Sequence, residues 1–256
     1  MSEVIRGLSG TDCPLGVIPA GTANILAKEL GIPPDPLGAV RAALAGEVRE
    51  MDLLRVNGRL AAMVTSAGLD AAVTRWMARS RRGHIGYLNY LEGIRRAFEH
   101  YSRPPMEVEV DGEVLGTFYQ VIVTNARLYG GLFRLAPEAC LDDGLLEVFG
   151  FAGRERHRVY KHFATMIAGC HRRLDDVRHR QGRSVEVRAG EAVPYQVDGD
   201  FVGTGPVTVE VAPLALHVVA PRWPIPWCWP SRRGGPWCRR DTRGSARENT
   251  ASDPHL

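Results

Sequence analysis

Short strand-like segments dominate the chain after residue 51. Two apolar runs flank Asn57-Gly58, a dipeptide that favours a tight hairpin because both residues tolerate positive φ. After Pro104-Pro105, further runs rich in Val, Ile, Thr and Phe cover residues 106–110, 114–124, 145–151, 184–188, 192–197, 207–211 and 215–219. Many short strands separated by turn residues are typical of packed sheets. We therefore expect residues 51–221 to form a β-rich, sandwich-like domain.

Helical spacing of apolar residues interrupts this pattern in three places, at residues 71–77, 86–101 and 156–168. The second of these segments carries apolar residues on one face and charged residues on the other, as an amphipathic helix does. The β-rich region is therefore expected to carry a helical excursion of its own.

The first 50 residues have a different pattern of predicted secondary structure. Leu15–Ile18 predicts a short buried strand that ends at Pro19, and residues 25–30 predict a helix that stops at Gly31. A second helix is expected over residues 36–45, with Asp35 as its cap. This order predicts part of an α/β nucleotide-binding domain over residues 1–50, so the fold class is α+β.

The turn between that strand and helix contains Gly21, Thr22 and Asn24. Glycine lets the backbone approach a ligand, while threonine and asparagine supply a hydroxyl and a helix cap. A helix N-terminus after such a turn suits an anion such as phosphate. The alternative is a plain strand-to-helix connection without a ligand.

Composition narrows the classes of function. The net charge of +3 comes from residues 231–256, which hold six Arg against three acidic residues, so nothing in the rest of the chain favours a nucleic-acid partner. No apolar run is long enough to cross a bilayer, and no secretory signal is visible. Five scattered cysteines lack zinc or redox spacing and fit a cytoplasmic location. Residues 222–256, rich in Pro, Trp and Arg, are expected to form a disordered tail.

The segment Pro19-Ala20-Gly21-Thr22-Ala23-Asn24, followed by Leu30-Gly31-Ile32-Pro33, resembles the Pro-x-Gly-Thr-x-Asn motif of the diacylglycerol kinase catalytic family, which also includes sphingosine, ceramide and bacterial lipid kinases. The resemblance implies that Thr22 contacts the nucleotide, with Gly21 and Asn24 in the same turn. It also implies that the Gly-Gly-Asp-Gly-Thr phosphate loop of the family should lie just before Met1. We therefore expect an N-terminally truncated nucleotide-binding domain that could be inactive as written.

Asp142-Asp143-Gly144 forms the first acidic motif. Two carboxylates before a glycine can hold a hard cation together with backbone carbonyls, or they can form a solvated turn. The surrounding residues resemble the Ala-Pro-x-Ala-x-x-Asp-Asp-Gly-x-Leu motif of the same family. The resemblance implies a Mg²⁺ site formed by the Asp143 carboxylate and the main-chain carbonyls of Cys140 and Leu145.

Asp198-Gly199-Asp200 forms the second acidic motif. One carboxylate could act as a general base with the other as its helper, or the dipeptide Asp-Gly could simply close a hairpin. The family carries Asp-Gly-Glu here, and its Glu is taken as the proton acceptor from the lipid hydroxyl. The resemblance therefore implies that Asp200 is the catalytic proton acceptor, with a carboxylate one methylene shorter than that of the family glutamate. Asp198 is then the candidate for the catalytic helper.

Three further residues are expected near the substrate. Gly130 and Gly131 follow a strand and allow a loop to pass close to a ligand, and Asp70 precedes a helix that it could cap. Both segments resemble family landmarks that line the cleft for the lipid head. They are therefore predicted substrate residues, with helix capping as the alternative role for Asp70.

Together these motifs predict a lipid kinase that transfers the γ-phosphate of ATP, with Mg²⁺, to a hydroxyl of a diacylglycerol-like lipid. The alternatives are a non-catalytic lipid-binding module and a fragment of an incomplete reading frame. A chain that acts on lipid must visit a membrane, so peripheral attachment at the inner membrane surface is expected. The exposed edges of a β-rich domain also allow pairing of two copies in a homodimer.

Overall fold

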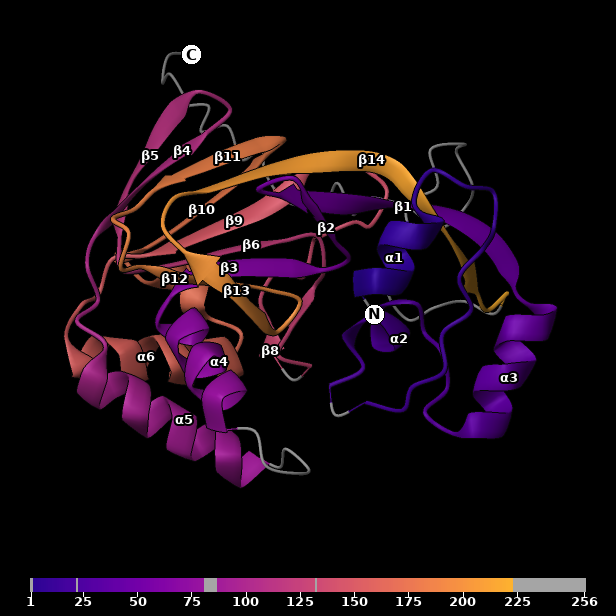
Figure 1. Ribbon diagram of the computed structural model, residues 1–256, viewed down its shortest axis with the longest axis horizontal. Helices are drawn as coiled ribbons and strands as arrows, with labels where there is room; N and C mark the ends of the chain where they lie inside the picture. Colours follow the sequence, from indigo (N-terminus) through magenta and orange to yellow (C-terminus); the bar gives the residue numbers. More distant parts are fainter. Residues whose placement is uncertain (1, 22, 81–86, 132, 223–256) are drawn as a thin grey trace, which may run out of the picture.

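The computed structural model describes residues 2–21, 23–80, 87–131 and 133–222 of the 256-residue chain. Two six-stranded antiparallel sheets face each other, and helices lie on one side of the pair and at one end of it (Figure 1). The predicted fold class, a mixture of helices with a β-sandwich-like region, is confirmed. The predicted tail lies outside the described residues from position 223 onward.

The first sheet, called sheet A, is built around the longest strand of the chain. Its strand order is β2-β1-β14-β11-β4-β5. In this order the strands span Arg59–Ala61, Glu47–Val56, Val207–Ala220, Ser184–Arg188, Met106–Val110 and Glu113–Phe118. β1 pairs with β14 from Glu47↔Ala220 to Val56↔Val209, with one irregularity near Met51. The predicted hairpin at Asn57-Gly58 connects β1 to β2 and is confirmed.

The second sheet, called sheet B, has the strand order β10-β9-β6-β3-β12-β13. In this order the strands span Val177–Gly182, Leu146–Phe151, Gln120–Thr124, Val64–Gly68, Pro194–Val197 and Asp200–Thr204. The facing sides of the two sheets carry the branched apolar residues, as in Val185↔Val209 of sheet A and Val123↔Val148 of sheet B. These residues form a core between the sheets because alternate residues of a strand share one face.

The helices divide into two groups. α4 (Leu69–Ser80), α5 (Tyr87–His100) and α6 (Arg156–Ile167), with the short η1 (His171–Arg173), lie below sheet B in Figure 1. α1 (Ser2–Leu8), α2 (Ile25–Glu29) and α3 (Pro36–Ala45) lie toward the far ends of β1 and β14. A small hairpin of β7 (Leu128–Tyr129) and β8 (Phe133–Arg134) lies between the two groups. Sheet B is therefore covered on both faces.

Two sequence expectations about strands were wrong, and two strands were not expected. Leu15–Ile18 is not a strand: Leu15 forms an isolated parallel bridge to Val218, and Ile18 is 55% exposed. The run 114–124 is not one strand, because it passes from sheet A (β5) to sheet B (β6) at Tyr119. β10 was not expected, since its sequence Val-Arg-His-Arg-Gln-Gly lacks an apolar run, and β13 was hidden beside the acidic turn.

Candidate functional site

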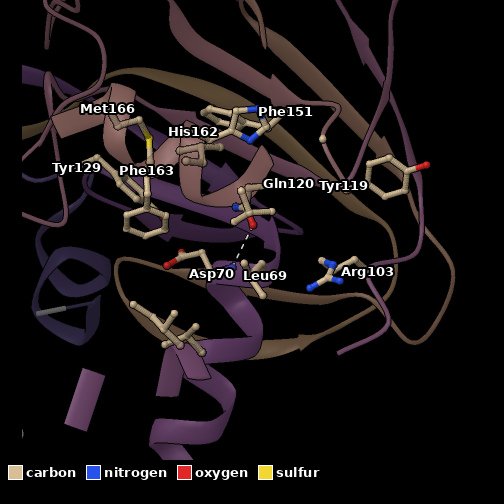
Figure 2. Close-up of a pocket in the computed structure, with 15 residues that line it drawn as sticks. Leu69, Asp70, Arg103, Tyr119, Gln120, Tyr129, Phe151, His162, Phe163 and Met166 are labelled. Carbon is tan, nitrogen blue, oxygen red and sulfur yellow. Dashed lines mark hydrogen bonds between the residues drawn. The ribbon is translucent and has the colours of Figure 1, made fainter. Parts of the chain in front are cut away.

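A pocket lies on the outer face of sheet B, between that sheet and helices α4, α5 and α6 (Figure 2). It holds about 650 Å³ of space not filled by atoms, the solvent at its mouth included. Most of its lining is apolar or aromatic, and it consists of Leu69, Asp70, Val73, Ile94, Arg103, Tyr119, Gln120, Ile122, Tyr129, Phe151, Gly153, Val159, His162, Phe163 and Met166. An apolar hollow with few polar groups suits a hydrocarbon ligand whose orientation is set by those groups.

Asp70 is the carboxylate of this pocket. Its Oδ2 accepts hydrogen bonds from Ser66 Oγ (2.6 Å) and Gln196 Nε2 (3.4 Å). Its backbone N–H donates to Gln120 Oε1 (3.0 Å), as Figure 2 shows. Asp70 was expected just ahead of a helix, but it lies inside the first turn of α4, which begins at Leu69. The bonds to its carboxylate given above come from side chains of sheet B.

Gln196 joins Asp70 to the second acidic motif. Its Oε1 accepts the N–H of Gly199 (2.7 Å), and its Nε2 donates to Ser66 Oγ (2.9 Å) as well as to Asp70. Both Gln196 and Ser66 are buried. Asp70 and the Asp198–Asp200 turn, which are 128 or more positions apart in the sequence numbering, are thus linked by one buried hydrogen-bond network.

The two carboxylates of that turn have different environments. The Asp198 carboxylate accepts hydrogen bonds from the N–H groups of Ala62 (2.7 Å), Met63 (2.9 Å) and Val64 (3.0 Å). Burial raises the pKa of Asp198, while these three bonds lower it. Asp200 is exposed at the start of β13. The contacts of Asp198 suit a residue that holds the β2–β3 connection in place. Its predicted role as a catalytic helper of Asp200 stays a prediction.

Within the predicted nucleotide turn, the side chain of Asn24 forms hydrogen bonds to the backbone of Gly21. Asn24 Oδ1 accepts the N–H of Gly21 (2.8 Å), and Asn24 Nδ2 donates to the carbonyl of Gly21 (2.7 Å). Asn24 has a left-handed backbone (φ 49°) at the start of α2 but makes no side-chain cap bond. Its amide therefore shapes the turn instead of capping the helix. Thr22 lies outside the described residues.

The structure brings this turn against the predicted substrate glycines. A Cβ on Gly131 would lie 2.9 Å from the carbonyl oxygen of Ala23, and the φ of Gly131 is +76°. Gly130, its neighbour, also has a positive φ of +60°. Only glycine permits this approach of two backbones without strain. The predicted nucleotide and substrate loops are therefore neighbours.

Charged residues that sequence reasoning missed hold these loops together. Lys28 Nζ donates to the carbonyl of Gly131 (2.7 Å). Glu29, which is 1% exposed, accepts from the N–H of Leu128 (2.8 Å) and from Nε of Arg127 (3.0 Å). The helical pattern of residues 25–30 gave no sign that Glu29 would be buried, because its partners lie about 100 residues away.

The first acidic motif forms a compact loop beside Asp52. Asp143 Oδ1 accepts the N–H of Leu145 (3.0 Å), and the buried Asp52 accepts the N–H of Gly144 (2.6 Å). Burial raises the pKa of Asp143 to about 6, with smaller contributions from the charges of Asp52 and Glu147, against the lowering effect of its bond to Leu145. A divalent cation bound beside Asp143 would favour the ionised form of its carboxylate.

Within the described residues, no group of three or more His, Cys, Asp or Glu side chains could hold a metal ion. The predicted Mg²⁺ site has another composition, one carboxylate of Asp143 and the carbonyls of Cys140 and Leu145, so it stays a prediction. The Cys140 thiol donates to the carbonyl of Glu138 (3.5 Å), and its sulfur was not expected to take part. Hard oxygen donors of this kind fit Mg²⁺.

Among the described residues, every helix is too short or too polar to cross a bilayer. The expected attachment to the inner membrane surface stays a prediction.

Comparison with known proteins gives two family matches. Residues 1–56 match the diacylglycerol kinase catalytic domain, and residues 63–220 match the YegS C-terminal NAD kinase beta sandwich-like domain. The second match covers sheet B, the pocket and the strands of sheet A other than β1 and β2. The family resemblance expected from the motifs is confirmed.

Curated relatives agree with these matches. The chain is 31% identical over 230 residues to a diacylglycerol kinase of Mycobacterium tuberculosis (strain H37Rv), an alignment that covers 87% of this chain and 74% of the relative. It is 28% identical over 227 residues to a diacylglycerol kinase of Bacillus subtilis (strain 168), which covers 87% and 75%. A probable lipid kinase YegS-like of Klebsiella pneumoniae (strain 342) is 27% identical, with 86% and 74% covered.

A solved structure shares the fold. The crystal structure of a diacylglycerol kinase from Bacillus anthracis (strain Sterne) superposes with a TM-score of 0.62 at 17% identity, over 86% of this chain and 72% of that one. The motifs, the two domain matches and the 31% identical relative lead to the same conclusion. This chain belongs to the diacylglycerol kinase family of lipid kinases.

Proposed function

We propose that this chain transfers the γ-phosphoryl group of ATP to the hydroxyl of a diacylglycerol-like lipid. The observation that carries the proposal is the apolar pocket on sheet B, whose carboxylate Asp70 is joined through Gln196 to the turn that bears Asp200. A lipid chain and a candidate proton acceptor can thus be held by one connected group of residues.

The pocket supports a lipid substrate in particular. Its walls come from α4, α5, α6 and sheet B, and they offer hydrocarbon surface for an acyl chain. Asp70 and Gln120 interrupt this surface side by side (Figure 2). The carboxylate of Asp70 can accept a hydrogen bond from a lipid hydroxyl or amine and so fix the head of the molecule near the acidic turn.

Asp200 is the proposed proton acceptor. Its carboxylate takes the proton of the lipid hydroxyl, the lipid oxygen forms a bond to the γ-phosphorus, and the bond from that phosphorus to the bridging oxygen breaks to release ADP. Asp198 is proposed only to position this turn, because its carboxylate is bonded to three backbone N–H groups.

The nucleotide is proposed to lie against the turn of Gly21, Thr22 and Asn24, next to Gly130 and Gly131. Support comes from the contact of Gly131 with Ala23 and from the bond of Lys28 to Gly131. Mg²⁺, when bound at Asp143 and the carbonyls of Cys140 and Leu145, supplies positive charge that stabilises the acidic loop. These residues would hold the ion and would take no part in the proton transfer.

A non-catalytic lipid-binding module is the second candidate. The pocket supports both candidates, because an apolar hollow binds lipid with or without phosphoryl transfer. The exposed Asp200 favours the enzyme, because a solvent-accessible carboxylate next to the pocket network can reach a substrate.

A transfer assay with labelled ATP, Mg²⁺ and mixed lipid vesicles separates the two candidates. We expect wild-type chain to label a lipid, and Asp200→Asn to lower turnover by about 10²–10⁴. Asp200→Glu should retain turnover, since it restores the longer carboxylate of the family. Asp12→Asn, a change at an exposed aspartate away from the pocket lining, is the matched control and should have no effect.

Two results would overturn the enzymatic proposal. If no lipid is labelled but the chain still binds lipid, the non-catalytic binding module is the remaining candidate. Equal turnover in wild type and Asp200→Asn would remove Asp200 from the mechanism. Unfolding midpoints of all variants show whether a loss of turnover comes from a loss of structure.

A further inference from the structure

Arg103 contributes an unusual group to the pocket. It lies in the connection between α5 and β4, directly before Pro104-Pro105, and its backbone is left-handed (φ 51°). In Figure 2 its guanidinium group points toward Leu69, and Arg103 and Tyr129 lie on opposite sides of Asp70. Arg103 is therefore at the end of the pocket away from the β7–β8 loop that contacts the nucleotide turn.

Buried donors of Arg103 and of the nearby Tyr101 have no acceptor among the described residues. The buried Nε and Nη1 atoms of Arg103 and the buried hydroxyl of Tyr101 form no hydrogen bond within the part of the chain that the structure describes. The Arg103 guanidinium has partial compensation from the ring of Phe98, 5.5 Å from the ring centroid. A buried N–H group without an acceptor is costly, so such groups point to a ligand or an ordered solvent molecule.

Two more arginines flank the same segment. Arg154 Nη2 donates to the carbonyl of Ser102 and Arg156 Nη2 to the carbonyl of Phe98, both at 3.4 Å. Burial, together with the positive charges of Arg156 and Arg154, lowers the pKa of Arg103. Among the described residues, no carboxylate forms an ion pair with any of these three arginines. The cluster thus carries positive charge that the described carboxylates do not pair with.

We propose that Arg103, Arg154 and Arg156, with the Tyr101 hydroxyl, bind a phosphate-type oxyanion at this end of the pocket. Three guanidinium groups and a phenol offer more donors than one carboxylate can accept, whereas a phosphate has several charged oxygens and suits planar guanidinium donors. The anion is not the phosphoryl group transferred by the proposed reaction, because Arg103 lies across Asp70 from the nucleotide side of the pocket.

The phosphate can come from two sources, the headgroup of an anionic phospholipid or free phosphate in solution. Arg154 and Arg156 are exposed, so a headgroup could reach them from a membrane surface. Arg103 lines the pocket, so a small soluble anion that enters the pocket could also reach it. The chemistry of recognition is the same in both cases, and the test has an arm for each.

In the first arm, inorganic phosphate is titrated into wild-type chain and binding is followed by calorimetry. In the second arm, flotation measures binding to vesicles of phosphatidylcholine alone and to vesicles that also contain phosphatidylglycerol. Arg103→Gln and the double variant Arg154→Gln/Arg156→Gln are each expected to weaken binding about tenfold. Arg103→Lys, which keeps the positive charge, should weaken binding less than Arg103→Gln does.

Arg188→Gln is the matched control. It removes the same charge, but Arg188 lies on sheet A and is paired with Glu107, Glu109 and Glu186. We expect it to bind both probes as wild type does. Since Arg103→Gln could perturb folding, the double variant at two exposed side chains repeats the test without touching the pocket wall.

Binding of inorganic phosphate that depends on Arg103 supports the site and a soluble anion. Binding only to phosphatidylglycerol vesicles, with the same dependence, supports the site and a lipid headgroup. The proposal is overturned if neither probe binds, or if Arg188→Gln weakens binding as much as the cluster variants do. A chain that binds phosphate at Arg103 but transfers none would overturn the proposed reaction and leave this site intact.

Discussion

The outer faces of the two sheets differ although both sheets have six antiparallel strands. On β4 and β11 of sheet A the outward residues are polar or charged, as in the cross-strand pairs Glu186↔Glu109 and Arg188↔Glu107. On sheet B the outward pairs Ile122↔Phe149 and Gln120↔Phe151 are covered by helices. The outer face of these strands of sheet A is therefore exposed to water and carries ion pairs, whereas the outer face of sheet B is packed against helices.

The covered face of sheet B also contains buried polar residues. Ser66, Thr124, Glu147 and Gln196 all lie there and are 3% exposed or less. Glu147 accepts a hydrogen bond from Gln181 (2.8 Å) and pairs with His179. Polar groups are costly to bury unless each finds a partner, so a covered face that keeps them is a place to look for function. The pocket and the Asp70 network lie on this face.

The two sheets should differ most in how much the free energy of unfolding falls when one outward residue on each is truncated to alanine. Phe149 on sheet B is fully buried and stacks on His179 with ring centroids 4.5 Å apart. Phe149→Ala should lower the free energy of unfolding by about 3–5 kcal/mol, because it removes a large side chain and leaves a cavity. Glu186→Ala on sheet A should have little effect. Chemical denaturation measures both, and equal losses would contradict the comparison.

A smaller loss is expected from the Asp198 carboxylate on the rim of sheet B. Asp198→Asn places an amide NH₂ opposite three backbone N–H donors and should cost about 2 kcal/mol of unfolding free energy. Asp200→Asn, two residues away and exposed, should leave stability unchanged. Urea unfolding of the two variants compares them directly, and a stable Asp198→Asn variant without turnover would instead return Asp198 to the catalytic group.

These two aspartates show what the sequence can and cannot predict. Asp198-Gly199-Asp200 could be recognised as a motif, and the hairpin reading of it matches the β12–β13 pairing. The different environments of its two carboxylates could not be predicted from the sequence. The contacts of Asp198 depend on N–H groups of residues 62–64, more than 130 positions away. Local pattern predicts local turns, but partners distant in sequence decide burial and hydrogen bonding.

The same limit applies to the strands and the pocket. The apolar alternation in residues 106–110 and 184–188 predicted β4 and β11 well, because one face of sheet A meets water. The edge strand β10 of sheet B gave no such signal because its sequence is mostly polar. The burial of Gln196 gave no local signal either, because it depends on the covered outer face of sheet B. Arg103 was also missed, since nothing in its local sequence shows that buried donors there lack acceptors.

Asp143, at the loop before β9 of sheet B, should make stability depend on pH. Burial raises its pKa from 3.8 to about 6, so its neutral form is favoured in the folded chain. The stabilising contribution is complete below pH about 4 and is lost as pH rises through about 6. After a discount for partial exposure this amounts to about 1 kcal/mol. Unfolding measured from pH 4 to 7 with a chelator should show the loss in wild type and not in Asp143→Asn.

Magnesium sharpens this prediction. The ionised carboxylate is the form that binds a hard cation, so Mg²⁺ should restore stability above pH 6 in wild type and have little effect in Asp143→Asn. Thermal unfolding with and without Mg²⁺ is the measurement. An equal response of both proteins to the ion would remove Asp143 from the predicted cation site.

The smallest effect is expected on the outer face of sheet A. Arg188 pairs with three carboxylates, but its side chain is 50% exposed, and ion pairs in water contribute little. Arg188→Gln should therefore leave the unfolding midpoint unchanged within error, at low and at high salt. A clear destabilisation would mean that this face is shielded from water in solution. Repeating the measurement over a range of protein concentrations would then test the predicted homodimer, because a face covered by a second copy gives a midpoint that rises with concentration.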